Sequence, residues 1–481
     1  MADLLVSGGP VLTMDAERRV IEDGAVAVTA GRIVAVGPRE EVEAAHPAPR
    51  VVDAARKLVM PGLIDVHAHA GHGLVKSMGI ATPGAWEALC GMVYTVGSTP
   101  QFWRAEAELA ALERLRFGVT CGVSLLGGGD TIMRSDRPEY AAAHAEGVLA
   151  VGTRDVLVVG PTRPPHPKTY ADFVDGVRHE RPVSFEEQLE TSLAVLRDWH
   201  GARDGRICVA LLTPVLRDEH VDALGPQLLA EAMENTKRVR AIAREAGVVF
   251  TQDGHWKGSV RRAQEMGILG PGALLSHCID IDEEEIALIA DTGTAVAHNP
   301  SAVASIMGRC PAIELMEAGA VVGLGSDATA PDRSADMFRH IQQAMHYHRT
   351  HFRDPSVLPA GKALEMATVD AAAALGMERE IGSLEPGKRA DIVLLDLARA
   401  HMAPFNMAPY RAAAFANGND VHTVIVGGEV VLEDRKALRV DEAAVLDAAD
   451  REAELMIERT ASRDLLRLPP DFFGSVRHRA G

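Results

Sequence analysis

Short runs of β-forming residues alternate with turns over residues 1–58, for example LLVSGGPVL at 4–12 and AVAVTAGRIVAVG at 25–37. Similar runs return near the other end of the chain, at 390–397 and 420–438, and a helical pattern follows over 441–461. We therefore predict that the two ends of the chain build one small β domain between them, followed by a helical tail.

Between these ends, apolar strands alternate with helical stretches, which is the pattern of parallel βα units. The candidate strands are eight: LIDVHAH, VTCGVSLL, DVLVVGP, ICVALLTP, VVFTQDGH, ALLSHCID, TAVAHNP and VVGLGSD. Eight such units over residues 59–385 predict an α/β fold of the (β/α)8 TIM barrel type, flanked by the terminal segments 1–58 and 386–481. Active sites of this fold lie at the C-terminal ends of the strands, so we expect the chemistry there.

Several of these strands end in side chains that bind divalent metals or move protons. They are His67 and His69 on the first strand, Asp253 and His255 on the fifth, His277 on the sixth, His298 on the seventh and Asp327 on the eighth. Residues two apart in a strand face the same side, so His67 and His69 can converge on one ion. Imidazoles from the first and fifth strands and a carboxylate from the eighth predict a mixed nitrogen and oxygen site with room for water.

Charge and cysteine content restrict the cellular compartment and the kinds of partner that we expect for this protein. The formal charge of -18 argues against nucleic acid or an anionic membrane surface as a partner. Five widely spaced cysteines without a CxxC pair indicate a reducing compartment. The N-terminal residues show no basic region followed by an apolar core, and no apolar window approaches the roughly 18 residues of a membrane span. We expect a cytoplasmic protein that acts on a small molecule.

Four stretches resemble the amidohydrolase superfamily, in particular its branch of triazine hydrolases and nucleobase-type deaminases. They are PGLIDVHAH at 61–69, GILGPGALLSHCIDIDEEEIALIADTGTAVAHNPSA at 267–302, GLGSDATAPDRSADMF at 323–338 and IGSLEPGKRADIVLLD at 381–396. The resemblance spans nearly the whole chain. It implies a (β/α)8 barrel with a β-sandwich made from both chain ends, and possible assembly into a homodimer or higher homo-oligomer.

The resemblance also implies one divalent ion, zinc in first place, with iron, manganese and cobalt as alternatives. Its ligands match His67, His69, a strand-five histidine and Asp327. His277 matches the residue that contacts the hydrolytic water or the leaving group of the substrate. Asp327, which touches both ion and water, would take the proton and pass it to the leaving group.

Strand five departs from the family pattern HxxE, since this chain reads VFTQDGHW at 249–256. Counting from the preceding residues places Asp253 at the ligand position, and counting back from the following residues places His255 there. In a regular strand both side chains face the same way, although a bulge at Gly254 would break that parity. We favour His255, because an imidazole completes the usual site. In neither register does a glutamate follow three residues on, where the positions hold Trp256 and Gly258.

These features predict a metal-dependent hydrolase that cleaves a non-peptide C–N bond of a small planar substrate with water activated by the ion, and so releases ammonia or an amine. The missing glutamate leaves an amide, urea, carbamate or dehalogenating hydrolase as an alternative. The alternative outside the enzymes is a metal-free binding protein built on the same barrel.

Other residues near the motifs are candidates for contact with the substrate. They are His72, Asp253, Trp256 and His298. Three further histidines, His346, His348 and His351, lie in a helical stretch beyond the eighth strand, and we expect them at a surface or an interface.

Overall fold

The computed structural model describes residues 1–481 except 83–84, 127–133, 303, 331–332 and 475–481. An eight-stranded parallel sheet forms its centre, in the order β15-β14-β13-β12-β11-β8-β7-β6. The strands are β6 (Leu63–Asp65), β7 (Val119–Leu125), β8 (Arg154–Val159), β11 (Ile207–Leu212), β12 (Phe250–Gln252), β13 (Ala273–Ser276), β14 (Ala295–His298) and β15 (Val322–Leu324). These are the eight strands that the sequence predicts, in the same order along the chain.

The first and last strands meet and bring the sheet close to a closed barrel. The amide of Val66 donates to the carbonyl of Leu324 at 3.1 Å, and the amide of Asp327 donates to the carbonyl of His67 at 2.8 Å. The expected TIM barrel is therefore confirmed. Its closure places the residues that follow β6 beside those that follow β15.

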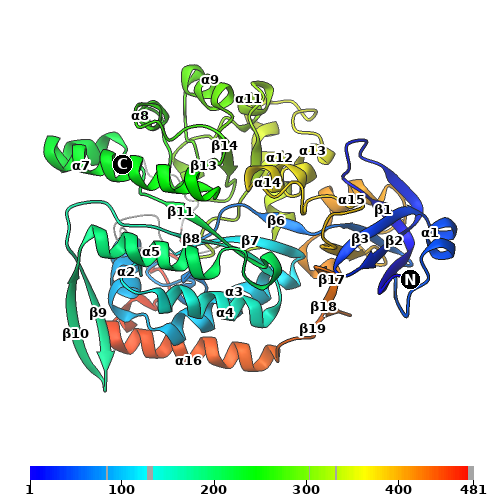
Figure 1. Cartoon of the computed structure of the whole chain (residues 1–481), viewed down its shortest axis with the longest axis horizontal. Coiled ribbons are helices and arrows are strands. Elements are labelled where there is room, and N and C mark those ends of the chain that lie inside the picture. Colours follow the sequence, from blue (N-terminus) through cyan, green and yellow to red (C-terminus); the bar gives the residue numbers. More distant parts are fainter. Residues whose placement is uncertain (83–84, 127–133, 303, 331–332, 475–481) are drawn as a thin grey trace.

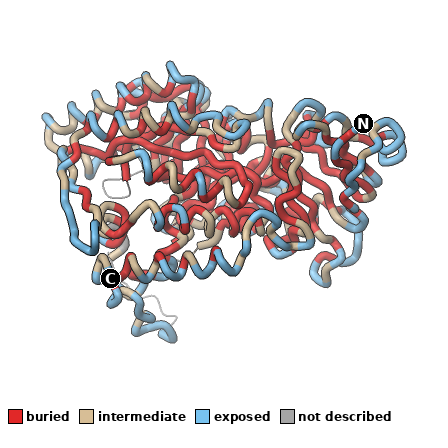
Figure 2. Tube along the Cα trace, turned by 60° about the horizontal axis from the view of Figure 1, so that its bottom comes forward, coloured by how far each residue is buried: buried red, intermediate tan, exposed pale blue. Residues whose placement is uncertain are grey.

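Helices cover the outside of the barrel (Figure 1). The principal ones are α3 (Pro100–Arg116), α4 (Pro138–Val151), α5 (Phe185–Trp199), α7 (Asp218–Ala246), α8 (Ser259–Glu265), α9 (Glu283–Thr292), α11 (Ala312–Glu317), α12 (Met337–Phe352), α13 (Ala360–Glu365) and α14 (Val369–Ala374). Side-chain caps set several starts: Ser184 with Glu187 forms a capping box at α5, and Asp282 with Glu285 forms one at α9. Figure 2 shows the buried residues concentrated along the central strands, with exposed residues on the outer turns of the helices.

A second sheet joins the two ends of the chain. Its strands run in the order β19-β18-β17-β16-β5-β1-β2-β3, and β4 pairs with β1. They are β1 (Leu4–Leu12), β2 (Val20–Thr29), β3 (Arg32–Pro38), β4 (Arg50–Asp53), β5 (Lys57–Pro61), β16 (Ile392–Asp396), β17 (Val421–Val426), β18 (Glu429–Glu433) and β19 (Lys436–Ala437). Antiparallel pairing of β16 with β5 joins the two segments, so the predicted β domain from both chain ends is confirmed.

The expected helical tail is α16 (Glu442–Thr460), which begins at an Asp441 cap. It packs along α3 of the barrel rather than on the β domain from which the chain leaves (Figure 1). The side chains of Met456 and Ile457 are buried in this contact, and Arg459 donates to the carbonyl of Gly97 at 3.3 Å. The C-terminal segment therefore braces the first βα unit of the barrel.

A two-stranded hairpin, β9 (Lys168–Val174) and β10 (Val177–Val183), is inserted after the third barrel strand, and the sequence pattern did not predict it. Buried Arg134 contacts the middle of β9, with hydrogen bonds to the carboxylate of Asp172 and the carbonyl of Ala171, each at 2.9 Å. Among the described residues, no helix combines the length and the apolar character that crossing a bilayer requires.

Candidate metal centre

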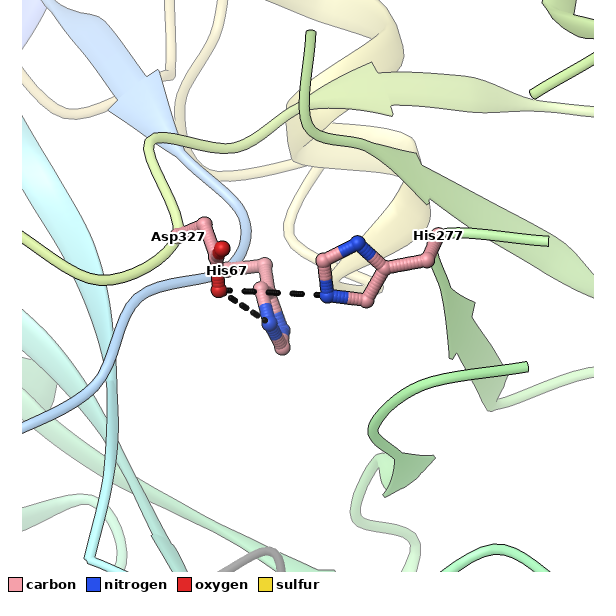
Figure 3. A group of neighbouring side chains, drawn as sticks. All are labelled: His67, His277 and Asp327. Carbon is pink, nitrogen blue, oxygen red and sulfur yellow. Dashed lines mark ion pairs between the residues drawn. The ribbon is translucent and has the colours of Figure 1, made fainter. Parts of the chain in front are cut away.

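Five of the predicted strand-end side chains meet at the C-terminal mouth of the barrel. They are His67, His69, Asp253, His277 and Asp327. The Nε2 atoms of the three histidines lie 3.1 to 3.8 Å from carboxylate oxygens of the two aspartates. The Oδ1 atom of Asp327 lies 3.5 Å from Nε2 of His67 and 3.3 Å from Nε2 of His69, and Figure 3 shows the rings of His67 and His277 both approaching this carboxylate.

The local backbone explains this convergence. His67 and His69 follow β6 beyond its regular part, where Ala68 bridges to Asp327 and His69 bridges to Leu125 of β7. His277 and Asp327 both adopt left-handed backbone conformations, with φ of 69° and 61°. Such angles are costly for residues other than glycine and are found at functional sites, where the surrounding structure enforces them.

Opposite charges in this cluster shift the pKa values of its members. Burial by itself would lower the pKa of His67, but the Asp253 carboxylate raises it to about 9. The pKa of His69 rises in the same way, to about 10. Burial acts to raise the pKa of Asp253, yet His67 and His69 hold it well below its usual range. Without a bound cation, the carboxylates therefore keep protons on both imidazoles.

A second layer of buried polar groups fixes the ligands. The Asp65 carboxylate accepts hydrogen bonds from the Ser326 amide at 2.9 Å and the Ser326 hydroxyl at 2.6 Å, so it holds the residue before Asp327. The Ser276 hydroxyl donates to Asp253 Oδ1 at 2.8 Å and accepts from the Gly254 amide at 3.1 Å. We did not identify either role from the sequence. A charged residue inside the apolar run LID is the signal that marks Asp65.

The donor set fits a divalent ion. Imidazole nitrogens and carboxylate oxygens are the ligands that zinc and related ions take in open catalytic sites. Two groups of three side chains, His67 with His69 and Asp253, and His67 with His277 and Asp327, each offer ligand atoms within 4.8 Å of one another. The Nε2 atom of His67 is buried and lacks a hydrogen bond of good geometry, although carboxylate oxygens lie close to it. A cation would satisfy that atom.

The structure does not bring His255, the residue favoured at strand five, into this group, and it places Asp253 there instead. Strand β12 ends at Gln252, and Gly254 turns the chain with φ of 84°, so the two side chains no longer share a face. His255 is fully buried, and its Nδ1 lies 2.9 Å from the Ser259 hydroxyl. Burial lowers its pKa to about 3.

The other predicted contact residues take varied positions. The ring of His72 stacks on that of His69, with 5.0 Å between centroids, and is almost wholly buried. Trp256 is half-buried, and the guanidinium carbon of Arg217 lies over its indole, 4.8 Å from the ring centroid.

His298, at the end of β14, pairs with a histidine of α12. Its Nε2 is 3.1 Å from Nε2 of His348, and both rings are fully buried. The expectation that His348 lies at a surface is therefore wrong, because this residue falls on the inner face of α12. His346, two residues earlier on the same helix, is exposed.

Comparison with known proteins identifies the family of the chain and its relatives. A model described as "Amidohydrolase family" matches residues 58–431, and one for an imidazolonepropionase-like composite domain of bacteria matches residues 24–48. The 5'-deoxyadenosine deaminase of Methanosarcina barkeri is 29% identical over 467 residues, which cover 95% of this chain and 99% of that protein. The 5-methylthioadenosine/S-adenosylhomocysteine deaminase of Nitratidesulfovibrio vulgaris is 31% identical over 92% of this chain and 95% of its own length.

Among solved structures, an adenosine deaminase from Xanthomonas campestris with bound zinc superposes with a TM-score of 0.81 at 24% identity. The match covers 95% of this chain and 99% of that one. Both the barrel and the terminal sheet therefore have counterparts in that structure.

Proposed function

Because the chain belongs to the amidohydrolase family and is a metal-dependent hydrolase of C–N bonds other than peptide bonds, we propose that it deaminates an adenine-type nucleoside. In this reaction water replaces the exocyclic amino group of the ring, and ammonia leaves. The observation that carries the proposal is the meeting of three imidazoles and two carboxylates at one strand-end site. The names of the relatives, all deaminases of adenosine derivatives, support the choice of substrate class.

We assign one zinc ion to His67, His69, Asp253 and Asp327, with His277 beside it. When bound, such an ion lowers the pKa of its water from 15.7 to about 7. Asp327 accepts the proton of the attacking water and delivers it to the leaving amino group. His277, whose Nε2 lies 3.1 Å from Asp253 and 3.8 Å from Asp327, orients the water or the reacting atom of the substrate.

We assign the planar ring of the substrate to the side of the mouth where Trp256 lies. Its indole is half-buried and stands next to the strand-five turn that carries Asp253. Aromatic rings contribute large apolar area and stack on planar groups. In this proposal His72, whose ring stacks on that of His69, supports this ligand, and His298 pairs with His348 instead of contacting the substrate.

An amide, urea or carbamate substrate, or a dehalogenation, is the second candidate. Strand five favours it, because Trp256 and Gly258 stand where a glutamate would protonate a ring nitrogen. His277 and Asp327 would then manage the protons of a reaction that needs no such step.

The test combines metal analysis with product release. We expect about one equivalent of zinc per chain, and ammonia from 5'-deoxyadenosine, 5'-methylthioadenosine, S-adenosylhomocysteine or adenosine, measured together with the change in ring absorbance. Activity confined to amides, ureas or chlorinated heterocycles would reject deamination. Assembly into a homodimer stays a prediction, which light scattering of the purified protein checks.

A further inference from the structure

A small cavity lies beside His69. Nε2 of His69 faces the carboxylates of Asp253 and Asp327, each at 3.3 Å. Its Nδ1 is buried and has no hydrogen bond. The cavity next to it has a volume of about 20 Å³, and its lining includes His69, Glu106, Ser326 and Thr329.

Glu106 presents a second unsatisfied atom in the same place. This residue of α3 is 1% exposed. Its Oε1 accepts the Gly73 amide at 3.4 Å, in the segment that follows the two histidines. Its Oε2 is buried without a hydrogen bond, and Nδ1 of His144 lies 3.7 Å from it. A buried carboxylate oxygen left in this state costs free energy, unless water or another donor satisfies it.

The size and chemistry of the cavity match one water molecule. A cavity needs roughly 10–15 Å³ of accessible volume to hold a water, and the water needs two to four polar partners. Three other polar groups of the lining already have partners: Ser326 binds Asp65, Glu113 binds Lys76 and the Ala335 amide, and Arg114 binds Ser124 and the Val123 carbonyl. Thr329, which also lines the cavity, is a third candidate partner.

We propose that one water molecule occupies this cavity and joins Nδ1–H of His69 to the carboxylate of Glu106, which makes Glu106 a positioning residue for the metal centre. The inference rests on the proposed function, in which His69 is a metal ligand. A proton held on Nδ1 leaves Nε2 unprotonated and directed at the ion. Second-layer partners of this kind fix the tautomer and the ring orientation of metal-binding histidines.

Replacement of Glu106 by glutamine tests the role of the carboxylate. Glutamate has two acceptor oxygens, one for the Gly73 amide and one for the water. In glutamine an NH2 group replaces one of them, so the group that faces the water donates instead of accepting, and the negative charge is lost. We expect Glu106→Gln to weaken zinc affinity, measured by competition with a chelator, by about 10–100-fold. Glu108→Gln, on the same helix with its carboxylate paired to Arg104, is the matched control, and we expect a change within about twofold.

A spectroscopic readout separates positioning from a loss of stability. In the cobalt-substituted protein, the exchangeable Nδ1–H proton of His69 gives a strongly shifted NMR signal, and Glu106→Gln should move it or abolish it while Glu108→Gln leaves it unchanged. Equal zinc affinities for Glu106→Gln and Glu108→Gln would overturn the proposal.

The water itself is tested without any variant, by a high-resolution crystal structure of the wild-type protein. Electron density for one water within hydrogen-bond distance of His69 Nδ1 and Glu106 Oε2 is the expected result, and an empty cavity overturns the proposal. If the wild-type protein takes up no zinc in equilibrium dialysis, the metal assignment fails. The same electron density map still shows whether the water occupies the cavity, independently of the metal.

Discussion

Nε2 of His277 lies 3.1 Å from Oδ1 of Asp253, although the two residues follow different strands of the barrel. The contact places a carboxylate at the strand-five position, where the family resemblance predicts an imidazole, and links it to the residue assigned to orient water. The Ser276 hydroxyl, next to His277 in sequence, holds the same oxygen of Asp253 at 2.8 Å. Asp253 is thus fixed from two sides.

Removal of the Asp253 carboxylate should cost the protein its metal. We expect Asp253→Ala to lower zinc affinity by about 100-fold or more, because a ligand and the charge that balances the ion are both lost. His255→Ala is the paired control and should keep its zinc, at some cost in stability, since His255 is fully buried. Metal analysis after dialysis decides between them. Zinc retained by Asp253→Ala and lost by His255→Ala would restore the sequence-based assignment.

Metal binding should release protons. The carboxylates beside His67 and His69 raise the pKa values of these imidazoles to about 9 and about 10, so both carry a proton at pH 7 when no cation is bound. Each Nε2 must lose that proton to coordinate the ion. We therefore expect release of about two protons per zinc at pH 7, and affinity that increases with pH up to about 9 or 10. Calorimetry in buffers of different ionisation enthalpy measures the number, and a value near zero contradicts the assignment.

Loss of the proton acceptor should reduce turnover more than substrate binding. Asp327→Asn keeps the shape of the side chain but removes its basicity. We expect kcat, expressed per bound zinc, to fall by roughly 10²–10⁴-fold, with a smaller change in KM. The exposed Asp291→Asn serves as the control. A kcat within a few-fold of wild type would exclude Asp327 as the general base.

Acid should weaken the fold through the buried pair of His298 and His348. Burial, with a smaller effect of Arg309, lowers the pKa of His348 from 6.5 to about 4, while Glu314 opposes the shift. Between these values the unfolded chain binds more protons than the folded one. The free energy of unfolding is therefore highest above pH 6.5 and falls by up to about 3 kcal/mol as the pH drops towards 4.

Urea unfolding at pH 7.5 and at pH 5 measures this dependence. His348→Asn should show a smaller loss between the two pH values than the wild-type protein. His346→Asn, an exposed position on the same helix, should follow the wild type. The same loss in all three proteins would show that the buried pair does not titrate in this range.

The sequence by itself determined the barrel, the small sheet and most of the side chains of the candidate metal centre. Strand and helix periodicity are local properties, so the eight strands could be predicted from alternating runs alone. Each strand of a parallel barrel delivers its last residues to the same mouth, and this placed His67, His69, His277 and Asp327 together without any coordinates.

Only the tertiary structure placed Asp253, and not His255, beside His67 and His69. The parity of a strand holds while its backbone stays extended, and the left-handed turn at Gly254 ends that condition. The burial of His348 likewise depends on which face of its helix meets the barrel. The same holds for the two buried atoms without a hydrogen bond, Nδ1 of His69 and Oε2 of Glu106. Such contacts join residues far apart in the chain, and no local pattern encodes them.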